Sequence, residues 1–372
     1  MRRIIAMDIN NLVIKALNAI KKDGITSNSR CGSVKGLFDC ELILTNPQNR
    51  HISLWARKYN IYASIAELIW VFSGDDNIDP LLSYFLKRTK DFSDDGKKWR
   101  GAYGPRLYHG KQISNIIHSF INEGITTRRA VFAIWTPYED TIFSIEETGY
   151  GLKDIPCTLG GTIWISKKKL FLKLFMRSND VIWGLSHINI LEWTFFQELI
   201  CYLLNNLLSY DVSLGYYHHS VTNLHCYERH LRLSDSILKS NKNLLEYNKR
   251  TSFALKVPYQ KNDIDGSIKN FFIALSDEIV SNINNSFRLN ERLNRINGIF
   301  DEIYRIEKER NLIYSYMIVI VLFIHFDNVS NKNDSDIAKA ILEFVPEDLK
   351  RSMLYSKKTP HEINKILKEE FL

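Results

Sequence analysis

The stretch 154-DIPCTLGGTIWISKKKLFLKLFMRSNDVIWGLSHIN-189 decides the fold. Its segments GTIWIS and KLFLKLFMRS are rich in β-branched and aromatic residues, which predicts two strands. The same stretch contains a Pro-Cys pair, an Arg-Ser-Asn-Asp segment, a Trp-Gly-Leu turn and an asparagine. A thiol, a cation, a carboxylate and an amide therefore lie close together in the sequence, next to predicted strand ends.

Segments on either side predict both helices and strands. Residues 10–23 and 64–74 carry apolar side chains at helical intervals, and residues 189–210 form a long, nearly all-apolar helix that must be buried. Residues 33–44 alternate as a strand does, and residues 128–135 predict another strand. We therefore predict an α+β fold, in which helices cover a mostly antiparallel or mixed sheet.

The character of the chain changes after about residue 235. Helical periodicities follow at 267–283, 292–311, 336–345 and 360–371. The apolar run 314–326 is shorter than the roughly twenty residues that span a bilayer, so we interpret it as a buried helix. We predict a catalytic domain at 1–235 and a helical C-terminal extension at 236–372, which serves as a lid, a dimer surface or a partner site.

Composition sets limits on the class of protein. The chain has 372 residues, 45% of them hydrophobic, which is enough for a full core. Its formal charge of +7 comes largely from scattered lysines, which favour a solvated surface over nucleic-acid binding. The five cysteines form no CxxC pair, which argues against a disulfide framework or a zinc site. No signal-peptide pattern is visible, and we expect a cytoplasmic, non-membrane protein.

The thiol of Cys157 is a candidate nucleophile. A cysteine reacts as the thiolate, and a neighbouring cation favours that charged form, for which Arg177 is a candidate. Taken alone, Cys157 fits a buried, inert thiol better than a nucleophile. The surrounding motifs decide between these interpretations.

Those motifs together resemble the thymidylate synthase family. In the family's order, the chain has Pro156-Cys157, Arg177-Ser178-Asn179-Asp180, Gly184-Leu185 before Asn189, and His225-Cys226-Tyr227. Upstream it has Ser29-Arg30-Cys31-Gly32, Glu67-Leu68-Ile69-Trp70, Gly74-Asp75-Asp76-Asn77, Gly101-Ala102-Tyr103-Gly104 and Thr127-Arg128-Arg129. The resemblance covers residues 10–230 and rests on the combination, because no single motif would suffice.

The resemblance implies transfer of a one-carbon unit from 5,10-methylenetetrahydrofolate to C5 of a pyrimidine nucleotide, favouring deoxyuridylate, with no metal. It assigns Cys157 to covalent attack at C6, which turns the ring into an enolate that attacks the one-carbon unit. It assigns Glu67 and Asn189 to the network at the C4 oxygen, Tyr103 to a water that accepts the C5 proton, and Asp180 to the pterin.

The resemblance also implies a homodimer with shared nucleotide sites. Fork-shaped guanidinium groups suit a phosphate well. Arg30, Arg177 and Ser178 are expected to bind the phosphate from one subunit, and Arg128 and Arg129 from the other. His225 and Tyr227 are expected to contact the sugar hydroxyl.

Departures from the family pattern leave the product open. Thr158 stands where synthases usually have histidine, and Asp154 stands at a usually apolar position. Polar, wetter surroundings favour capture of the intermediate by water, so a hydroxymethyl product is the alternative to a methyl product. The turn before Asn189 is one residue longer than usual, which affects the register of Asn189. The side-chain amide of Asn189 suits uracil. A non-catalytic nucleotide sensor or interaction protein is the alternative of another class.

Overall fold

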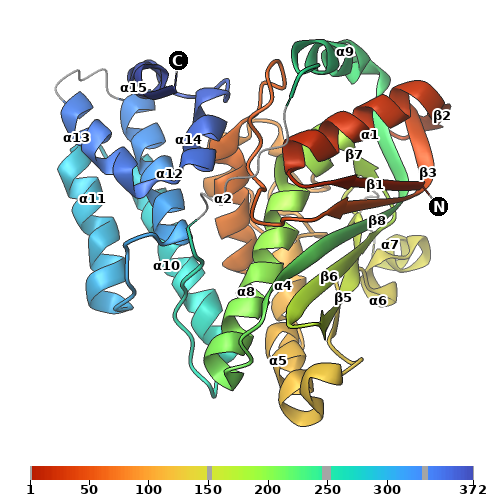
Figure 1. Cartoon of the computed structure of the whole chain (residues 1–372), viewed down its shortest axis with the longest axis horizontal. Coiled ribbons are helices and arrows are strands. Elements are labelled where there is room, and N and C mark those ends of the chain that lie inside the picture. The colour runs from red at the N-terminus through yellow and green to blue at the C-terminus, as the bar shows by residue number, and fades with distance from the viewer. Residues whose placement is uncertain (1, 149–152, 245–252, 329–333, 372) are drawn as a thin grey trace. The chain divides into compact units, whose positions relative to one another are not determined.

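The computed structural model describes residues 2–148, 153–244, 253–328 and 334–371 (Figure 1). The chain forms two compact units. The first unit comprises Met1–Tyr59 and Gly110–Arg250, and the second comprises Asn60–His109 and Thr251–Leu372. The C-terminal helices therefore share a unit with residues 60–109, and the domain boundary after residue 235 stays a prediction.

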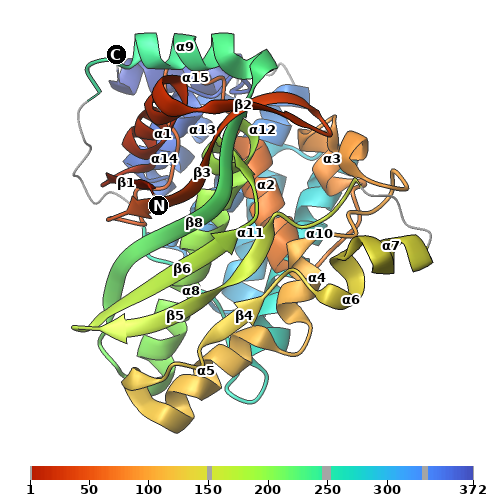
Figure 2. The same cartoon turned by 90° about the vertical axis from the view of Figure 1, so that its right-hand side faces the viewer.

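The first unit is built on an eight-stranded mixed sheet (Figure 2). Its strands are β1 Arg2–Ala6, β2 Ile25–Ser29, β3 Gly32–Leu44, β4 Val131–Ala133, β5 Thr158–Ser166, β6 Lys169–Met176, β7 Asn179–Asp180 and β8 Ser213–Tyr227. The order is β1-β3-β8-β6-β5-β4, with β2 paired to β3 and β7 paired to β8. β8 runs antiparallel to β3 and parallel to β6 and β7, so it connects most of the predicted motifs.

Helices cover one face of this sheet. The unit contains α1 Ile9–Asp23, α5 Gln112–Glu123, α6 Pro137–Asp140, α7 Ile142–Thr148, the π-helix η3 Val181–Asn189, α8 Ile190–Leu208, α9 Leu231–Ser240, and the 3₁₀ turns η2 Gly124–Thr126 and η4 Glu228–His230. The helix α8 packs against β6 and β8, and Gln197 donates from it to the carbonyl of Leu170 at 2.9 Å. Since α8 is buried along most of its length, its nearly all-apolar sequence is explained.

The second unit is helical. Its helices are α2 Ile61–Phe72, α3 Leu81–Phe85, η1 Thr89–Phe92, α4 Tyr103–Tyr108, α10 Ile264–Asn284, α11 Leu289–Gly298, η5 Ile299–Ile303, α12 Leu312–Asn328, α13 Ser335–Ile341, η7 Leu342–Phe344, α14 Glu347–Leu354 and α15 His361–Phe371. The buried helix α2 contacts α10 through Phe72 and Phe272, whose rings lie 5.3 Å apart. Within the described ranges, no helix is long and apolar enough to cross a membrane.

Most sequence-predicted elements are confirmed, and the fold is α+β as expected. The predicted buried helix at 314–326 lies within α12. Two predictions were wrong in extent. The strand expected at 128–135 is limited to β4, and the helix expected at 292–311 is α11, which ends at Gly298 and is followed by the short π-helical η5. The central strand β8 was not predicted.

Gly104 in the second unit permits a close approach between α4 and α2. A Cβ atom on Gly104 would lie 2.3 Å from the carbonyl oxygen of Val71 and 3.0 Å from Cα of Gly74. Both neighbours are backbone atoms, so neither can move aside cheaply. Because Gly104 has no side chain, the start of α4, where Tyr103 lies, can pack against the end of α2.

We expect Gly104→Ala to lower the free energy of unfolding by about 1–3 kcal/mol, because overpacking shifts the backbone. The matched control is Gly298→Ala, at a helical position where a Cβ would meet nothing within 4 Å. The control should be neutral or stabilising by up to about 1 kcal/mol. Chemical denaturation of both variants measures the difference, and equal stabilities would contradict the packing argument.

Candidate active site

The thiol of Cys157 lies half-buried at the start of β5, and it is not in a disulfide. Arg177 holds the chain at Cys157 and at the two residues before it. The backbone N–H of Arg177 donates to the carbonyl of Cys157 at 2.9 Å. Its side chain donates from Nε to the carbonyl of Pro156 at 2.9 Å, and from Nη2 to that of Ile155 at 2.8 Å. Arg177 therefore fixes the backbone that presents the thiol.

Burial and charge act on the thiol in opposite directions. Burial raises the pKa of Cys157 above its usual value, and the carboxylate of Asp154 also raises it. The guanidinium groups of Arg177 and Arg30 lower it. The cation expected beside the thiol is thus present, but burial outweighs its effect.

Arg30 approaches the same segment from another strand end. Its Nη2 donates to the carbonyl of Lys153 at 2.7 Å, four residues before the thiol. Arg30 follows β2 directly, and both Arg30 and Arg177 are exposed. The structure therefore brings two of the four predicted phosphate arginines to the segment before Cys157, where the guanidinium groups of both remain accessible to an anion.

The predicted sugar-binding pair lies beside the Arg-Ser-Asn-Asp segment. β7 pairs with β8 so that Asp180 faces His225, and the Ser178 hydroxyl lies 3.5 Å from Nδ1 of His225. The rings of His225 and Tyr227 meet edge to face at 5.2 Å. Burial lowers the pKa of His225, with the Asn223 carbonyl opposing, so its ring is neutral at neutral pH. A neutral imidazole can both donate to and accept from a hydroxyl.

Asp180 caps the N-terminus of the π-helix η3. Its carboxylate accepts from the backbone N–H groups of Ile182 at 2.9 Å and Trp183 at 3.4 Å. Burial raises the pKa of Asp180 to about 6 against these bonds and the charges of Arg57 and Arg229. Its predicted contact with a pterin would thus involve a carboxyl group that gains a proton in mildly acidic solution.

The extra residue before Asn189 is accommodated by the π-helix. The sequence predicted a turn, whereas residues 181–189 form π-helical turns, which hold more residues per turn than an α-helix. The buried side chain of Arg57 stabilises this segment. It donates to the Ser186 hydroxyl at 2.8 Å, to the Ser186 carbonyl at 3.1 Å and to the carbonyl of Ile182. Asn189 ends the segment as a buried residue.

The remaining predicted catalytic residues, Glu67 and Tyr103, belong to the second unit. Glu67 is half-buried in α2, and burial raises the pKa of Glu67 to about 8, so the carboxyl group is largely protonated at neutral pH. Tyr103 begins α4, which contacts α2. A protonated carboxyl group can donate a hydrogen bond as well as accept one.

Arg128 and Arg129 lie away from the Cys157 of their own chain. They precede β4, whose Val131 pairs with Thr162 of β5 and whose Ala133 pairs with Gly160. Because the pairing is antiparallel, moving back from Val131 to Arg128 leads away from Cys157. Arg129 binds Glu123 at 3.0 Å with its side chain 82% exposed. These two residues therefore cannot share a phosphate with Arg177 of the same chain.

The sequence did not single out Arg229 or Arg57. The guanidinium of Arg229 lies 4.1 Å from the centre of the Tyr227 ring and 5.1 Å from that of Trp183, and it donates to the carbonyl of Cys31 at 2.7 Å. Its position two residues after the His-x-Tyr motif was the available signal. Arg57 gave no signal, because its partners are mainly backbone carbonyls more than a hundred residues away.

These contacts define a protein with a cysteine thiol whose backbone is held by an arginine, beside a His-Tyr pair on a mixed sheet. The thymidylate synthase family model matches residues 14–266, well over half of the chain. The chain belongs to the thymidylate synthase family.

Curated relatives carry two kinds of name. A deoxyuridylate hydroxymethyltransferase of Delftia phage PhiW-14 is 36% identical over 235 residues, which are 62% of this chain and 64% of the relative. A protein of the same name from Bacillus phage SP01 is 27% identical over 58% of this chain and 56% of the relative. A thymidylate synthase of Mycoplasma genitalium is 25% identical over 52% of this chain and 77% of the relative. The chain thus spans less than two thirds of the hydroxymethyltransferases' length.

The raised pKa of Asp180 predicts a pH-dependent effect on stability. Because the folded-state pKa of about 6 exceeds the usual value, protonated Asp180 favours folding at low pH, and this contribution is lost as the pH rises through 6. Compared with Asp180→Asn, the native protein should therefore lose about 2 kcal/mol of stability between pH 4 and 7.5. Exposed Asp235, paired with Lys21, supplies the control Asp235→Asn. Parallel pH dependences for all three proteins in thermal melts would refute the effect.

Proposed function

We propose that this protein transfers a one-carbon unit from 5,10-methylenetetrahydrofolate to C5 of deoxyuridylate and releases a hydroxymethyl product. Family membership supports the class of reaction, and the names of the phage relatives support the base and the product. The observation that carries the product is polar surroundings at the thiol. The Asp154 carboxylate acts on Cys157 electrostatically, and the next residue, Thr158, is fully buried.

The first step is addition of the Cys157 thiolate to C6 of the pyrimidine. This places electron density on C5 and the C4 oxygen, and C5 then attacks the one-carbon unit. Because burial raises the pKa of Cys157, the charges of Arg177 and Arg30 are needed to favour the thiolate. The amide of Asn189 supplies a hydrogen bond to the C4 oxygen as its charge grows.

The second stage distinguishes the two products. Loss of the C5 proton and of the folate amine leaves an exocyclic methylene at C5. Hydride from the folate would give a methyl group and dihydrofolate. Attack by water on the methylene, followed by departure of the Cys157 thiolate, gives a hydroxymethyl group and tetrahydrofolate without any redox change. Polar groups beside Cys157 favour the route through water, because they retain water at the thiol.

The open face of the sheet supports the homodimer. Large apolar side chains of the strands remain exposed on the first unit, including Phe38 at 54%, Phe175 at 39% and Tyr216 at 43%. Strand β6 alternates buried residues with Phe171, Lys173 and Phe175, so these three side chains share the face away from α8. Exposed apolar surface of this kind marks a protein interface. The occupant we propose is a second copy of the chain.

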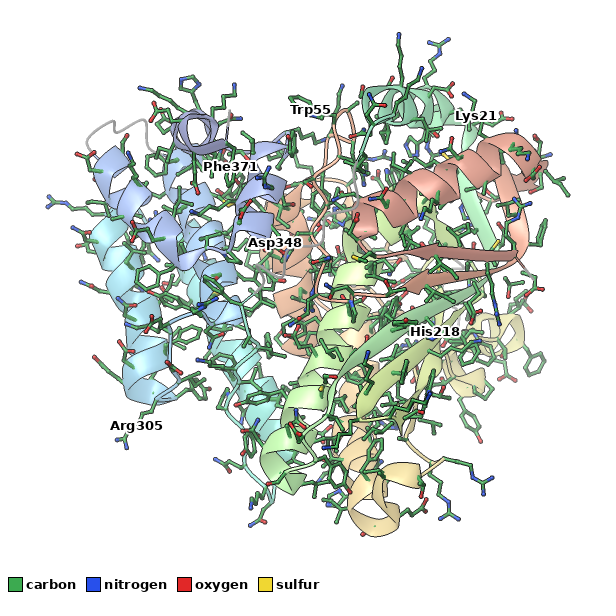
Figure 3. All side chains as sticks on the ribbon, viewed as in Figure 1. Lys21, Trp55, His218, Arg305, Asp348 and Phe371 are labelled. Atoms are coloured by element: carbon green, nitrogen blue, oxygen red, sulfur yellow. The ribbon has the colours of Figure 1, made fainter. Side chains whose placement is uncertain are left out.

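A polar cluster lies on the same face. Glu41 binds Arg3 at 3.0 Å and Lys173 at 2.9 Å, and Nδ1 of His218, labelled in Figure 3, lies 3.4 Å from its carboxylate. Desolvation would raise the pKa of Glu41, but Lys173 and His218 hold it below its usual value. The charges of the cluster are thus largely compensated, which makes it compatible with a buried interface.

We expect the purified protein, given deoxyuridylate and methylenetetrahydrofolate, to form a hydroxymethyl nucleotide without dihydrofolate. Mass spectrometry of the nucleotide and absorbance of dihydrofolate measure the two products. Cys157→Ser should lose activity by more than about a thousandfold, because a hydroxyl is a far weaker nucleophile for C6. Cys201→Ser, a buried thiol bonded to the Val212 carbonyl, is the matched control and should remain active.

The alternatives have distinct signatures in the same assay. A methyl nucleotide with stoichiometric dihydrofolate would identify a synthase. Nucleotide binding that is unchanged in Cys157→Ser, with no product from the native protein, would identify a sensor and contradict the proposal.

We expect two inactive variants to complement each other, because each site takes Arg128 and Arg129 from the partner. Cys157→Ser supplies intact arginines, and the Arg128→Gln/Arg129→Gln variant supplies an intact thiol. Unfolding and refolding the two variants together should restore activity to about a quarter of native, since half of the randomly assorted dimers contain one complete site. Refolding each variant alone is the control. Failure to recover activity, although mixed dimers are present, would place the arginines outside the partner's site.

A further inference from the structure

A chain of buried hydrogen bonds runs from β8 to the Arg-Ser-Asn-Asp segment. The hydroxyl of Tyr217 lies 2.8 Å from Nδ1 of His219, and Nε2 of His219 lies 2.7 Å from Nδ2 of Asn179. Tyr217 and His219 are fully buried, and Asn179 is 3% exposed. None of these residues was assigned a role by the sequence or by the proposed mechanism.

His219 takes part in this chain as a neutral ring. Burial lowers the pKa of His219 to about 3, so it has one N–H donor and one acceptor nitrogen at neutral pH. Tyr217 keeps its proton, because burial raises its pKa well above the usual value. Which nitrogen of His219 carries the proton is therefore determined by what Asn179 offers it.

The amide oxygens of Asn179 and Asn189 both lie beside Gly184. A Cβ atom on Gly184 would lie 2.0 Å from Oδ1 of Asn179 and 2.7 Å from Oδ1 of Asn189. Oδ1 of Asn179 is buried without a hydrogen-bond partner. The two amide oxygens therefore both lie beside Gly184, and the one on Asn179 has no donor. Such an arrangement is unfavourable for buried acceptors.

Rotating the Asn179 amide by half a turn removes this conflict, and the oxygen and nitrogen of an amide are assigned from their hydrogen bonds. Tyr217 then donates to Nδ1 of His219, and Nε2–H of His219 donates to Oδ1 of Asn179. The amide nitrogen of Asn179 faces Oδ1 of Asn189. The rotation removes only the weak contact between Nδ2 of Asn179 and Sδ of Met176, which lie 3.4 Å apart. Every polar group of the chain then has a complementary neighbour.

We propose that Asn179, oriented by His219 and Tyr217, is a positioning residue that fixes the direction of the Asn189 amide and so selects the base. When Asn179 donates a hydrogen bond to Oδ1 of Asn189, the N–H group of Asn189 points toward the nucleotide. A carbonyl at C4, as in uracil, accepts from this N–H, whereas the amino group of cytosine meets donor against donor. This inference rests on the proposed function, because it deepens the role of Asn189.

The geometry explains why the selection needs a neighbour. An asparagine amide is symmetric in shape, so an unrestrained Asn189 could rotate and offer its oxygen to an amino group instead. The buried residues of β8 prevent that rotation without placing any charge near the base. Discrimination by a mismatched buried donor is typically large, because the unpaired group has lost its water.

Two substitutions at Asn179 separate the effect from simple destabilisation. Asn179→Ala removes the restraint, so the ratio of deoxyuridylate to deoxycytidylate affinity should fall at least about tenfold. Asn179→Asp accepts from both His219 and the Asn189 N–H, which turns the Asn189 oxygen toward the base. The ratio should therefore fall further than in Asn179→Ala. Tyr217→Phe, which loses the donor to His219, should lower the ratio in the same direction by less.

The control is Asn205→Ala, which removes another asparagine of the first unit, bonded to Val212 at 2.8 Å and 2.9 Å. Its base ratio should equal the native ratio even if its melting temperature falls. Equilibrium binding of both nucleotides is measured together with turnover. If turnover is absent but the binding ratios follow the predicted order, the proposed function fails and the inference stands. Native base ratios in Asn179→Ala and Tyr217→Phe would overturn it, and Tyr217→Phe alone decides if the Asn179 variants do not fold.

Discussion

The structure of the site depends on the hydrogen bonds between Arg177 and the three residues that end in Cys157. Backbone and side chain of Arg177 bind three consecutive carbonyls, so the end of β6 and the start of β5 are tied together beside the thiol. The same guanidinium favours the thiolate. A lysine could supply the charge, but its single ammonium could not bind two carbonyls in the same planar geometry. One residue therefore fixes the position of the Cys157 thiol and is also one of the two cations that lower its pKa.

Much of the site could be predicted from the sequence, because its residues lie in short motifs at strand ends. The Arg-Ser-Asn-Asp segment follows directly from β6, and Arg30 follows β2, so local sequence is enough to identify them. The central strand β8 could not be predicted. Its sequence SLGYYHHSVTNLHCY places His219 and His225 at buried positions, where the usual pattern has apolar residues. Those histidines are tolerated because Asn179 and Ser178, distant in sequence, provide partners.

Short sequence motifs do not show how deeply a residue is buried. Burial accounts for the properties of the site that the sequence did not reveal. Arg57 is recognisable as a site residue only once its carbonyl partners in η3 are known. The pKa values of Asp180, about 6, and Glu67, about 8, likewise follow from desolvation rather than from the residue types. The extra residue before Asn189 made the register of Asn189 difficult to predict from the sequence. It is absorbed by a π-helix that Arg57 binds, so a local irregularity requires a distant cation.

The interior of the site thus holds its polar groups mainly in neutral form. His219 and His225 have lowered pKa values, so both imidazoles act as hydrogen-bonding groups rather than as ions. Charge is concentrated instead on the arginines near the exposed edge. This separation suits a nucleotide, because its phosphate is recognised by charge, while uracil and cytosine differ at C4 only in the direction of a hydrogen bond. A site that distinguishes the bases must therefore fix the direction of an amide, and buried neutral partners achieve this without attracting either base electrostatically.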